Sequence, residues 1–157
     1  MENYKILFVC LGNICRSPSA EAVMKALVEK QGLTNHFEID SAGIIDVHQG
    51  EPADARMKRR ANIRGYQLTS ISRPINKHDF THFDWIIGMD DQNIRDLRQL
   101  APDEASLHKT HKMTDFAHSG HYAIVPDPYY GGDQGFEMVL DILEEACEGL
   151  LHALKNK

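Results

Sequence analysis

Short apolar segments alternate along the chain with longer stretches in which apolar residues recur every three or four positions. Lys5 to Val9 contains Ile-Leu-Phe-Val and predicts a buried parallel strand. Phe37 to Ala42 and Phe83 to Met89 predict two more strands, and Leu107 to Met113 predicts a weak, polar edge strand. Because the strands are separated by helices, we expect an α/β fold with a parallel sheet covered on both faces.

The helical stretches are bounded by residues that start or stop helices. In the first helix, Ser17 is the expected N-cap, Pro18 the first helical residue and Gly32 the stop. Pro52 opens the next helix and Gly65 ends it. Three helices are therefore expected after the first, over residues 52–64, 91–100 and 135–154.

The bulk composition narrows the class of protein. The chain of 157 residues is long enough for one domain spanning 1–157. A net charge of −6 argues against general nucleic-acid binding, and the apolar run after Lys5 is too short for export or membrane insertion. Three cysteines without framework spacing predict a reducing, cytoplasmic location, and Cys147 falls on the apolar face of the last helix, as core. One basic patch is expected to be a solvated helix face: Lys58, Arg59, Arg60 and Arg64.

The histidines raise the question of a metal site. His108 with His111, and His118 with His121, have ligand-like spacing. No carboxylate or cysteine cluster completes either pair, so solvated loops without metal are expected there.

Chemistry concentrates where the first strand ends, in Val9-Cys-Leu-Gly-Asn-Ile-Cys-Arg-Ser-Pro18. Cys10 is expected at the bottom of a loop of converging backbone N–H groups, beside Arg16, whose planar fork matches the oxygens of a phosphate. Gly12 and Asn13 tolerate the positive φ of a tight anion-binding turn. The helix N-terminus adds positive potential that stabilises a thiolate, so the loop predicts attack on a bound oxyanion. The alternative is a buried strand-end thiol with a surface arginine.

Such attack on a phosphate ester needs an acid for the leaving oxygen. The best candidate is Asp127, in Pro126-Asp-Pro-Tyr-Tyr-Gly-Gly132, because the prolines stiffen the loop and Tyr129 and Tyr130 can wall an aromatic leaving group. An ordinary Asp-Pro turn is the alternative reading. Three other carboxylates are rival acids: Asp46, Asp90 and Asp115.

Four motifs in order along the chain resemble the low-molecular-weight protein tyrosine phosphatases: V-C-L-G-N-I-C-R-S-P, D-S-A-G, F-D-W-I-I-G-M-D and D-P-Y-Y-G-G. The resemblance covers nearly the whole chain. It implies a four-stranded parallel sheet flanked by helices, with a phosphate-binding loop after the first strand. It also implies metal-free and cofactor-free hydrolysis of phosphotyrosine in proteins.

The resemblance implies roles for individual residues. Cys10 would form a phosphocysteine, Arg16 would clamp the phosphoryl oxygens, and Asp127 would act as general acid and then base. Ser17 would hydrogen-bond the Cys10 sulfur, and Asn13 would hold the loop through Ser41. Cys15 would form a protective disulfide with Cys10 or be a small buried filler. The phosphate-binding loop and its support comprise Leu11, Gly12, Asn13, Ile14, Cys15, Ser17 and Ser41.

Other positions bear on substrate choice. Ile14 matches the phosphotyrosine members, whereas the phosphoarginine branch typically has Thr there. The substrate rim comprises Leu11, Val47, Tyr129 and Tyr130. Val47 stands where many members have Trp, so one aromatic wall is missing. Ser70 replaces a His that pairs with the glutamate matching Glu21, so the support of the loop is expected to differ.

Other functions remain as alternatives. Arsenate reductase chemistry needs two further cysteines midway along the chain, and none lies between Cys15 and Cys147. A phosphopeptide-binding module would need neither a thiolate nor an acid. The expected partners are phosphotyrosine-bearing proteins, among them a tyrosine kinase, with no nucleic acid, and the chain is expected to be a monomer or weak dimer.

Overall fold

A four-stranded parallel sheet forms the centre of the molecule. The computed structural model describes residues 2–129 and 131–156. The strands are β1 (Tyr4–Cys10), β2 (Phe37–Gly43), β3 (Trp85–Gly88) and β4 (Thr110–Lys112), in the order β2-β1-β3-β4. The predicted sheet is confirmed. Its polar edge strand, in which every residue is half-buried, is shorter than predicted, because Leu107 ends a short helix and Met113 begins a 3-10 turn.

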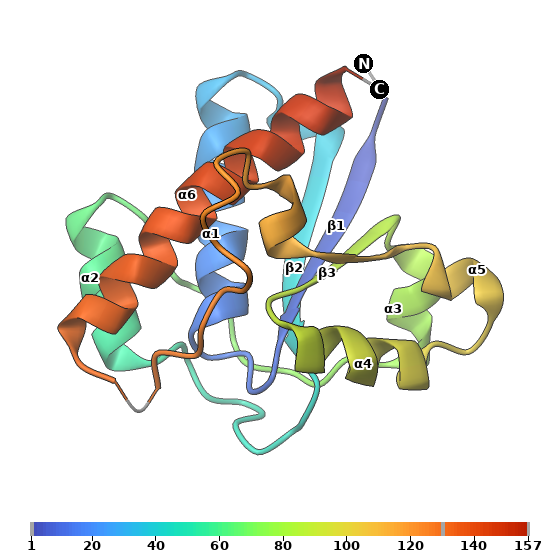
Figure 1. Cartoon of the computed structure of the whole chain (residues 1–157), viewed down its shortest axis with the longest axis horizontal. Helices are drawn as coiled ribbons and strands as arrows, with labels where there is room; N and C mark the ends of the chain where they lie inside the picture. Colours follow the sequence, from blue (N-terminus) through green and yellow to red (C-terminus); the bar gives the residue numbers. More distant parts are fainter. Residues whose placement is uncertain (1, 130, 157) are drawn as a thin grey trace.

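Helices cover both faces of the sheet (Figure 1). On one face lie α1 (Arg16–Lys30), α2 (Ala55–Ile63) and α6 (Asp133–Lys155). The other face carries α3 (Lys77–His82), α4 (Asp91–Leu100) and α5 (Glu104–Leu107). Two short 3-10 turns, Thr34–His36 and Met113–Phe116, complete the described elements. In the part of the chain described, no helix is both long enough and apolar enough to cross a membrane.

Alternation along β1 explains the two layers of core. Ile6 and Phe8 pack with α1 and α6, whereas Leu7 and Val9 pack with the side chains of the opposite layer. All four are fully buried, as a strand inside a parallel sheet requires. Cys147 on α6 is fully buried in the first of these clusters, which confirms its place in the core.

The first helix starts earlier than its sequence predicts. It begins at Arg16, with Cys15 as N-cap and no side-chain cap, so the expectation that Ser17 is the N-cap is wrong. Pro18 is the third helical residue rather than the first, a position in the first turn where its missing N–H costs nothing. Ser17 does not cap the helix because its hydroxyl group contacts Cys10 and Asn13 instead.

The second helix starts later than predicted. Asp54 caps it by accepting from the backbone N–H groups of Arg56 and Met57, and Pro52 lies in an antiparallel bridge with Ile71. The first helical residue is therefore Ala55. An aspartate cap with two backbone donors outweighs the preference of proline for the first helical position.

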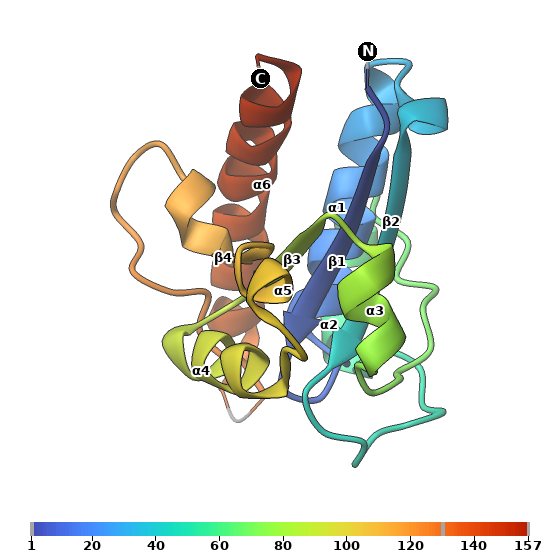
Figure 2. The same ribbon diagram turned by 90° about the vertical axis from the view of Figure 1, so that its right-hand side faces the viewer.

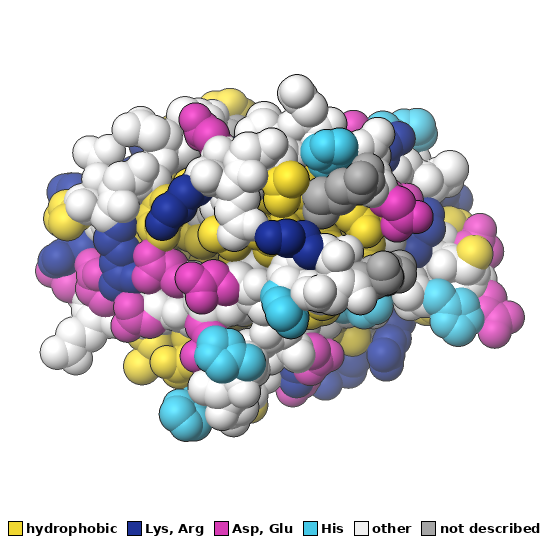
Figure 3. Space-filling view, turned by 90° about the horizontal axis from the view of Figure 1, so that it is seen from above, with side chains coloured by type: hydrophobic (Ala, Val, Ile, Leu, Met, Phe, Trp, Pro, Cys, Tyr) yellow, Lys and Arg dark blue, Asp and Glu magenta, His cyan; other side chains and the backbone are white. Residues whose placement is uncertain are grey.

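The basic patch of α2 is not wholly a solvated face. Arg64 forms ion pairs of 2.7 to 2.9 Å with Glu137, Asp141 and Glu144 of α6, and Arg60 pairs with Asp133. Figure 3 shows basic and acidic side chains interleaved at the end of the molecule where α2 and α6 lie. Such partly exposed pairs contribute little stability individually, but together they fix α2 against α6.

The carboxyl end of β1 lies away from the end of the molecule where the chain begins. Figure 2 shows β1 running along the molecule to the loop that enters α1. Ligands of doubly wound parallel sheets bind beyond this edge.

Candidate active site

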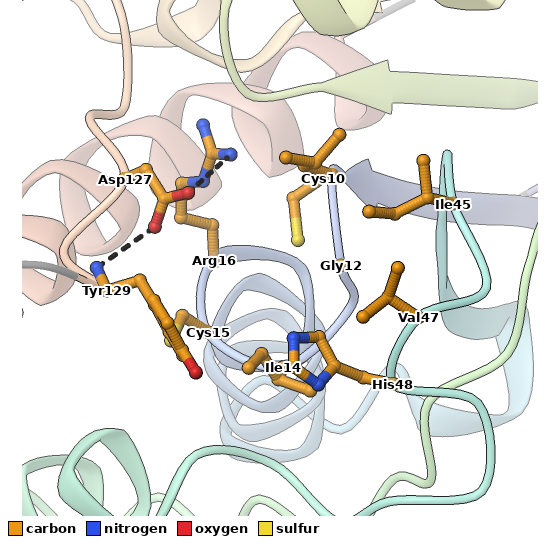
Figure 4. Close-up of a pocket in the computed structure, with 11 residues that line it drawn as sticks. Cys10, Gly12, Ile14, Cys15, Arg16, Ile45, Val47, His48, Asp127 and Tyr129 are labelled. Carbon is orange, nitrogen blue, oxygen red and sulfur yellow. Dashed lines mark hydrogen bonds and ion pairs between the residues drawn. The ribbon is translucent and has the colours of Figure 1, made fainter.

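A pocket of about 190 Å³ opens at the carboxyl edge of the sheet (Figure 4). Its floor is the loop between β1 and α1, and its walls come from the loop after β2 and the loop before α6. The lining residues are Cys10, Leu11, Gly12, Ile14, Cys15, Arg16, Ile45, Val47, His48, Asp127 and Tyr129.

Cys10 is the last residue of β1, and its side chain lies at the inner end of the pocket. It is buried, and its Sγ lies 3.1 Å from the Oγ of Ser17. The loop that follows is tight because Asn13 adopts a φ of 58°, as predicted, whereas Gly12 keeps a negative φ. A Cβ at Gly12 would lie 3.0 Å from His48 Cδ2, so any larger residue there would have to displace the His48 ring slightly.

Behind the loop, a series of hydrogen bonds joins Asn13 to Ser17 and, through Ser41, to Glu21. Asn13 Nδ2 donates to Ser17 Oγ at 2.8 Å and to Ser41 Oγ at 3.1 Å, while its Oδ1 accepts from the N–H of Arg73. Ser41 in turn donates to Glu21 Oε1 at 2.6 Å. Because Ser17 accepts from Asn13, its own proton can be donated, and two acceptors lie within reach of it: the Cys10 sulfur at 3.1 Å and the carbonyl of Ala42 at 3.4 Å.

Glu21 is held differently from the pairing that the family resemblance implies. Its other oxygen lies 2.6 Å from Lys25 Nζ, one helical turn along α1. Ser70 lines the groove beside α2. Lys25 therefore supplies a cation to Glu21 where the resemblance leads one to look for a histidine.

Arg16 begins α1 and is almost completely buried, with 3% of its side chain exposed. Its Nη1 lies 2.6 Å from Asp90 Oδ2 and donates to the carbonyl of Val125 at 3.1 Å, which fixes the plane of the guanidinium. Burial alone would lower the pKa of Arg16. The charges of Cys10, Asp90 and Asp127 and the hydrogen bond to Asp90 raise that pKa above its usual value, so the side chain stays cationic.

Asp127 stands on the wall across from Ile45 and Val47 (Figure 4). Its Oδ2 lies 3.6 Å from Arg16 Nη2, and its Oδ1 accepts from the backbone N–H of Tyr129 at 3.0 Å. With 42% of its side chain exposed, the carboxyl of Asp127 is open to solvent as well as to the pocket.

The rival carboxylates have other positions. Asp90 lies near the pocket but caps α4, accepting from the N–H of Asn93 at 2.7 Å, while also holding Arg16. Asp46 and Asp115 are exposed and do not line the pocket.

The rim of the pocket is apolar on one side and aromatic on the other. Leu11, Val47 and Tyr129 line it as predicted, and Val47 is 68% exposed. Tyr130 lies outside the described residues. Sequence reasoning missed His48, whose ring centroid lies 6.0 Å from that of Tyr129 and which supplies a ring one residue after Val47.

Two other features of the sequence can now be placed. Cys15 lines the pocket, and burial, together with the charge of Asp54, raises the pKa of its thiol well above the usual range, so it is protonated at neutral pH. Its pairing with Cys10 stays a prediction. In the described part of the chain, no three His, Cys, Asp or Glu side chains are grouped so that they could hold a metal ion.

Comparison with known proteins decides the family. The family model described as low molecular weight phosphotyrosine protein phosphatase matches residues 5–157. The chain belongs to this family. A low molecular weight protein-tyrosine-phosphatase of Streptomyces coelicolor is 42% identical over 156 residues, with 98% of this chain and 95% of the relative covered.

Solved structures agree with this assignment. A protein tyrosine phosphatase from Entamoeba histolytica, with Hepes in its active site, superposes with a TM-score of 0.95 at 49% identity, and 98% of each chain is covered. A Drosophila arginine phosphatase superposes with a TM-score of 0.91 at 33% identity, covering 96% of this chain and 98% of that one. Membership of the family makes the chain a cysteine-dependent phosphatase, a hydrolase of phosphoric monoesters.

Proposed function

We propose that this enzyme hydrolyses phosphotyrosine in proteins, with Cys10, Arg16 and Asp127 as its catalytic residues. One observation supports this most: a buried sulfur, a fixed arginine and an exposed carboxyl line the same small pocket. A binding site for phosphate would need the arginine but neither of the other two groups.

In the first step, the Cys10 thiolate attacks phosphorus and forms an S–P bond while the P–O bond to the tyrosyl oxygen breaks. Asp127, in its carboxylic acid form, gives its proton to that leaving oxygen. The fork of Arg16 binds two of the equatorial oxygens, whose charge it offsets in the transition state.

In the second step, water attacks the phosphocysteine. Asp127 is now a carboxylate and takes a proton from the water, so inorganic phosphate forms and the S–P bond breaks. The electron pair returns to the Cys10 sulfur. Ser17 Oγ, at 3.1 Å, donates to that sulfur and stabilises the thiolate as it leaves.

The walls favour an aromatic phosphoester. Ile14 is buried and lines the pocket, and Tyr129 and His48 present rings across from one another at the mouth. A phenyl ring packs well against such apolar and aromatic surfaces, whereas a guanidinium would lose water without gaining a polar partner at Ile14. We therefore infer a preference for phosphotyrosine over phosphoarginine, despite the likeness to the arginine phosphatase.

The three cysteines indicate where in the cell the enzyme works. Cys10, Cys15 and Cys147 are all free and buried, which suits the reducing cytoplasm, where the nucleophile stays a thiol. We infer a cytoplasmic enzyme that meets phosphotyrosine-bearing proteins, tyrosine kinases among them.

Steady-state hydrolysis of 4-nitrophenyl phosphate with EDTA present tests the proposal. Wild type should turn over, Cys10→Ser should not, and Cys147→Ala, which removes a cysteine outside the pocket, should keep its activity. No turnover by reduced, folded wild type would overturn the phosphatase function. Phosphoarginine hydrolysed faster than phosphotyrosine would overturn the substrate preference alone.

A further inference from the structure

A side chain of α2 holds the loop that carries Asp127. Arg56 is the second residue of α2, and its Nη2 donates to the carbonyl of Tyr129 at 2.8 Å. Its guanidinium carbon lies 5.4 Å from the ring centre of Tyr129 and 5.0 Å from that of Phe136, within cation–π range of both. Arg56 thus contacts both the loop after Asp127 and the start of α6.

Arg56 is itself fixed by Asp54. Its Nε lies 3.2 Å from Asp54 Oδ1, and its Nη2 lies 3.0 Å from Oδ2, a two-point pairing that sets the plane of the guanidinium. Burial raises the pKa of Asp54, but the hydrogen bonds from Arg56 and from the backbone of Met57 lower that pKa by more. The net pKa is below its usual value, so Asp54 is ionised at neutral pH.

The pair is also joined to the nucleophile loop. The backbone N–H of Asp54 donates to the carbonyl of Ile14 at 2.8 Å, and Ile14 lies between the nucleophile and Arg16 in the sequence. A continuous series of contacts therefore runs from the nucleophile loop through Asp54 and Arg56 to Tyr129.

Tyr129 in turn orients the acid. Its N–H donates to Asp127 Oδ1, leaving Oδ2, the oxygen nearer Arg16, to carry the proton toward the pocket. Asp127 is 42% exposed, so packing alone does not hold it. Proton transfer to a leaving oxygen depends on the heavy atoms being within hydrogen-bond distance, and a loop displaced by about 1 Å loses much of it.

We propose that Arg56 is a positioning residue for proton transfer: by holding the Tyr129 carbonyl it keeps Asp127 over the leaving oxygen. This inference rests on the proposed function. The carboxyl still performs the chemistry, and Arg56 touches neither the phosphate nor the leaving group.

The test uses aryl phosphates whose leaving phenols differ in acidity. A good leaving group such as 4-nitrophenol needs little protonation, whereas phenol needs the proton from Asp127. Arg56→Ala should lower kcat/KM about 30-fold for phenyl phosphate and less than about threefold for 4-nitrophenyl phosphate, within the range that a positioned acid contributes. Arg56→Lys, which keeps a donor but loses the two-point pairing, should recover part of the loss.

Two further variants sharpen the result. Arg59→Ala removes an exposed arginine from the same helix and should leave both substrates unaffected. In an Asp127→Ala background, Arg56→Ala should cause no further loss with phenyl phosphate, because the two residues act on one proton transfer. A residue that merely stabilised the fold would give additive losses.

Each outcome has one meaning. Equal losses on both substrates, or losses that add to those of Asp127→Ala, would overturn the positioning role while leaving the phosphatase intact. Absence of any wild-type turnover would instead overturn the proposed function itself. If Arg56→Ala does not fold, as its urea unfolding curve would show, Arg56→Gln is measured on the same two substrates and judged by the same criteria.

Discussion

The direction of the hydrogen bonds behind Cys10 follows from two groups, the carboxylate of Glu21 and the backbone N–H of Arg73. A carboxylate can only accept, so Ser41 must donate to it and must accept from Asn13. The N–H of Arg73 donates to Oδ1 of Asn13 and so turns Nδ2 toward Ser41 and Ser17. The proton of Ser17 is then left for the Cys10 sulfur, the nearer of its two acceptors. A buried acid and a backbone N–H behind the loop thus determine which group faces Cys10.

Glu21→Gln tests this direction. The neutral amide loses the ion pair with Lys25, and where its nitrogen faces Ser41 it no longer accepts the Ser41 proton. The hydrogen bonds that hold Asn13, and through it the Ser17 donor facing Cys10, are then weakened. We expect kcat/KM for 4-nitrophenyl phosphate to fall about tenfold, equivalent to about 1.4 kcal/mol of transition-state stabilisation. Glu29→Gln, an exposed change on the same helix, is the matched control. A kcat/KM within twofold of wild type would contradict the argument.

At this scale, the pocket and its nearest supports, the contacts of Ser17 with Cys10 and of Asn13 with Ser41, were predictable from the sequence, and the surrounding residues were not. Cys10, Arg16 and Asp127 come from motifs whose neighbouring residues limit the loop geometry, and the structure brings all three to one pocket. Lys25 and His48 carry no such signal. A lysine one turn after a glutamate is common on solvated helices, and only the fold shows that this glutamate is buried.

At the scale of elements, strands and long helices were predictable because their apolar periodicity extends over many residues. The bounds of α4 were predicted without error. The short helices α3 and α5 were missed, since six and four residues are too few for a periodic pattern. Their signals were local: Asn76 and Asp103 cap them through backbone N–H groups three residues on. Side-chain competition explains the first turn of α1, where Ser17 bonds to the site instead of capping.

One element contact makes a sharp prediction about stability. Gly149 in α6 passes so close to the turn at Met113–Phe116 that an added Cβ would lie 1.8 Å from the carbonyl oxygen of Phe116. Alanine would improve helix propensity by about 1 kcal/mol, but the backbone clash must displace one element and costs more.

We therefore expect Gly149→Ala to lower the free energy of unfolding by about 2 kcal/mol in urea titrations. Glu148→Ala, the exposed neighbour on the same helix, should change it by less than about 0.5 kcal/mol. A Gly149→Ala variant as stable as wild type would mean that α6 and this turn are not in contact there.

At the scale of the whole molecule, the protein and its phosphate substrate carry net charges of the same, negative sign. The chain carries a net charge of −6, while the cation of the pocket, Arg16, is buried and already paired with Asp90. A phosphomonoester dianion is therefore attracted only at short range, after it enters the pocket, where burial strengthens the interaction with Arg16. Recognition by the shape of the pocket and by Arg16 at short range has to replace long-range steering.

This balance predicts how activity responds to salt. Between 10 and 100 mM potassium chloride the screening length falls from about 30 to 10 Å, which weakens repulsion from the acidic surface. We expect kcat/KM for phenyl phosphate to stay level or rise up to about twofold over this range, whereas an enzyme that steers its substrate would lose activity steeply. Chloride that competes for Arg16 would give a decline continuing in proportion to concentration above 100 mM, while screening levels off. A steep fall in kcat/KM confined to the lowest salt concentrations would show that the protein attracts its substrate at long range. It would contradict the argument, because it requires a basic surface around the pocket.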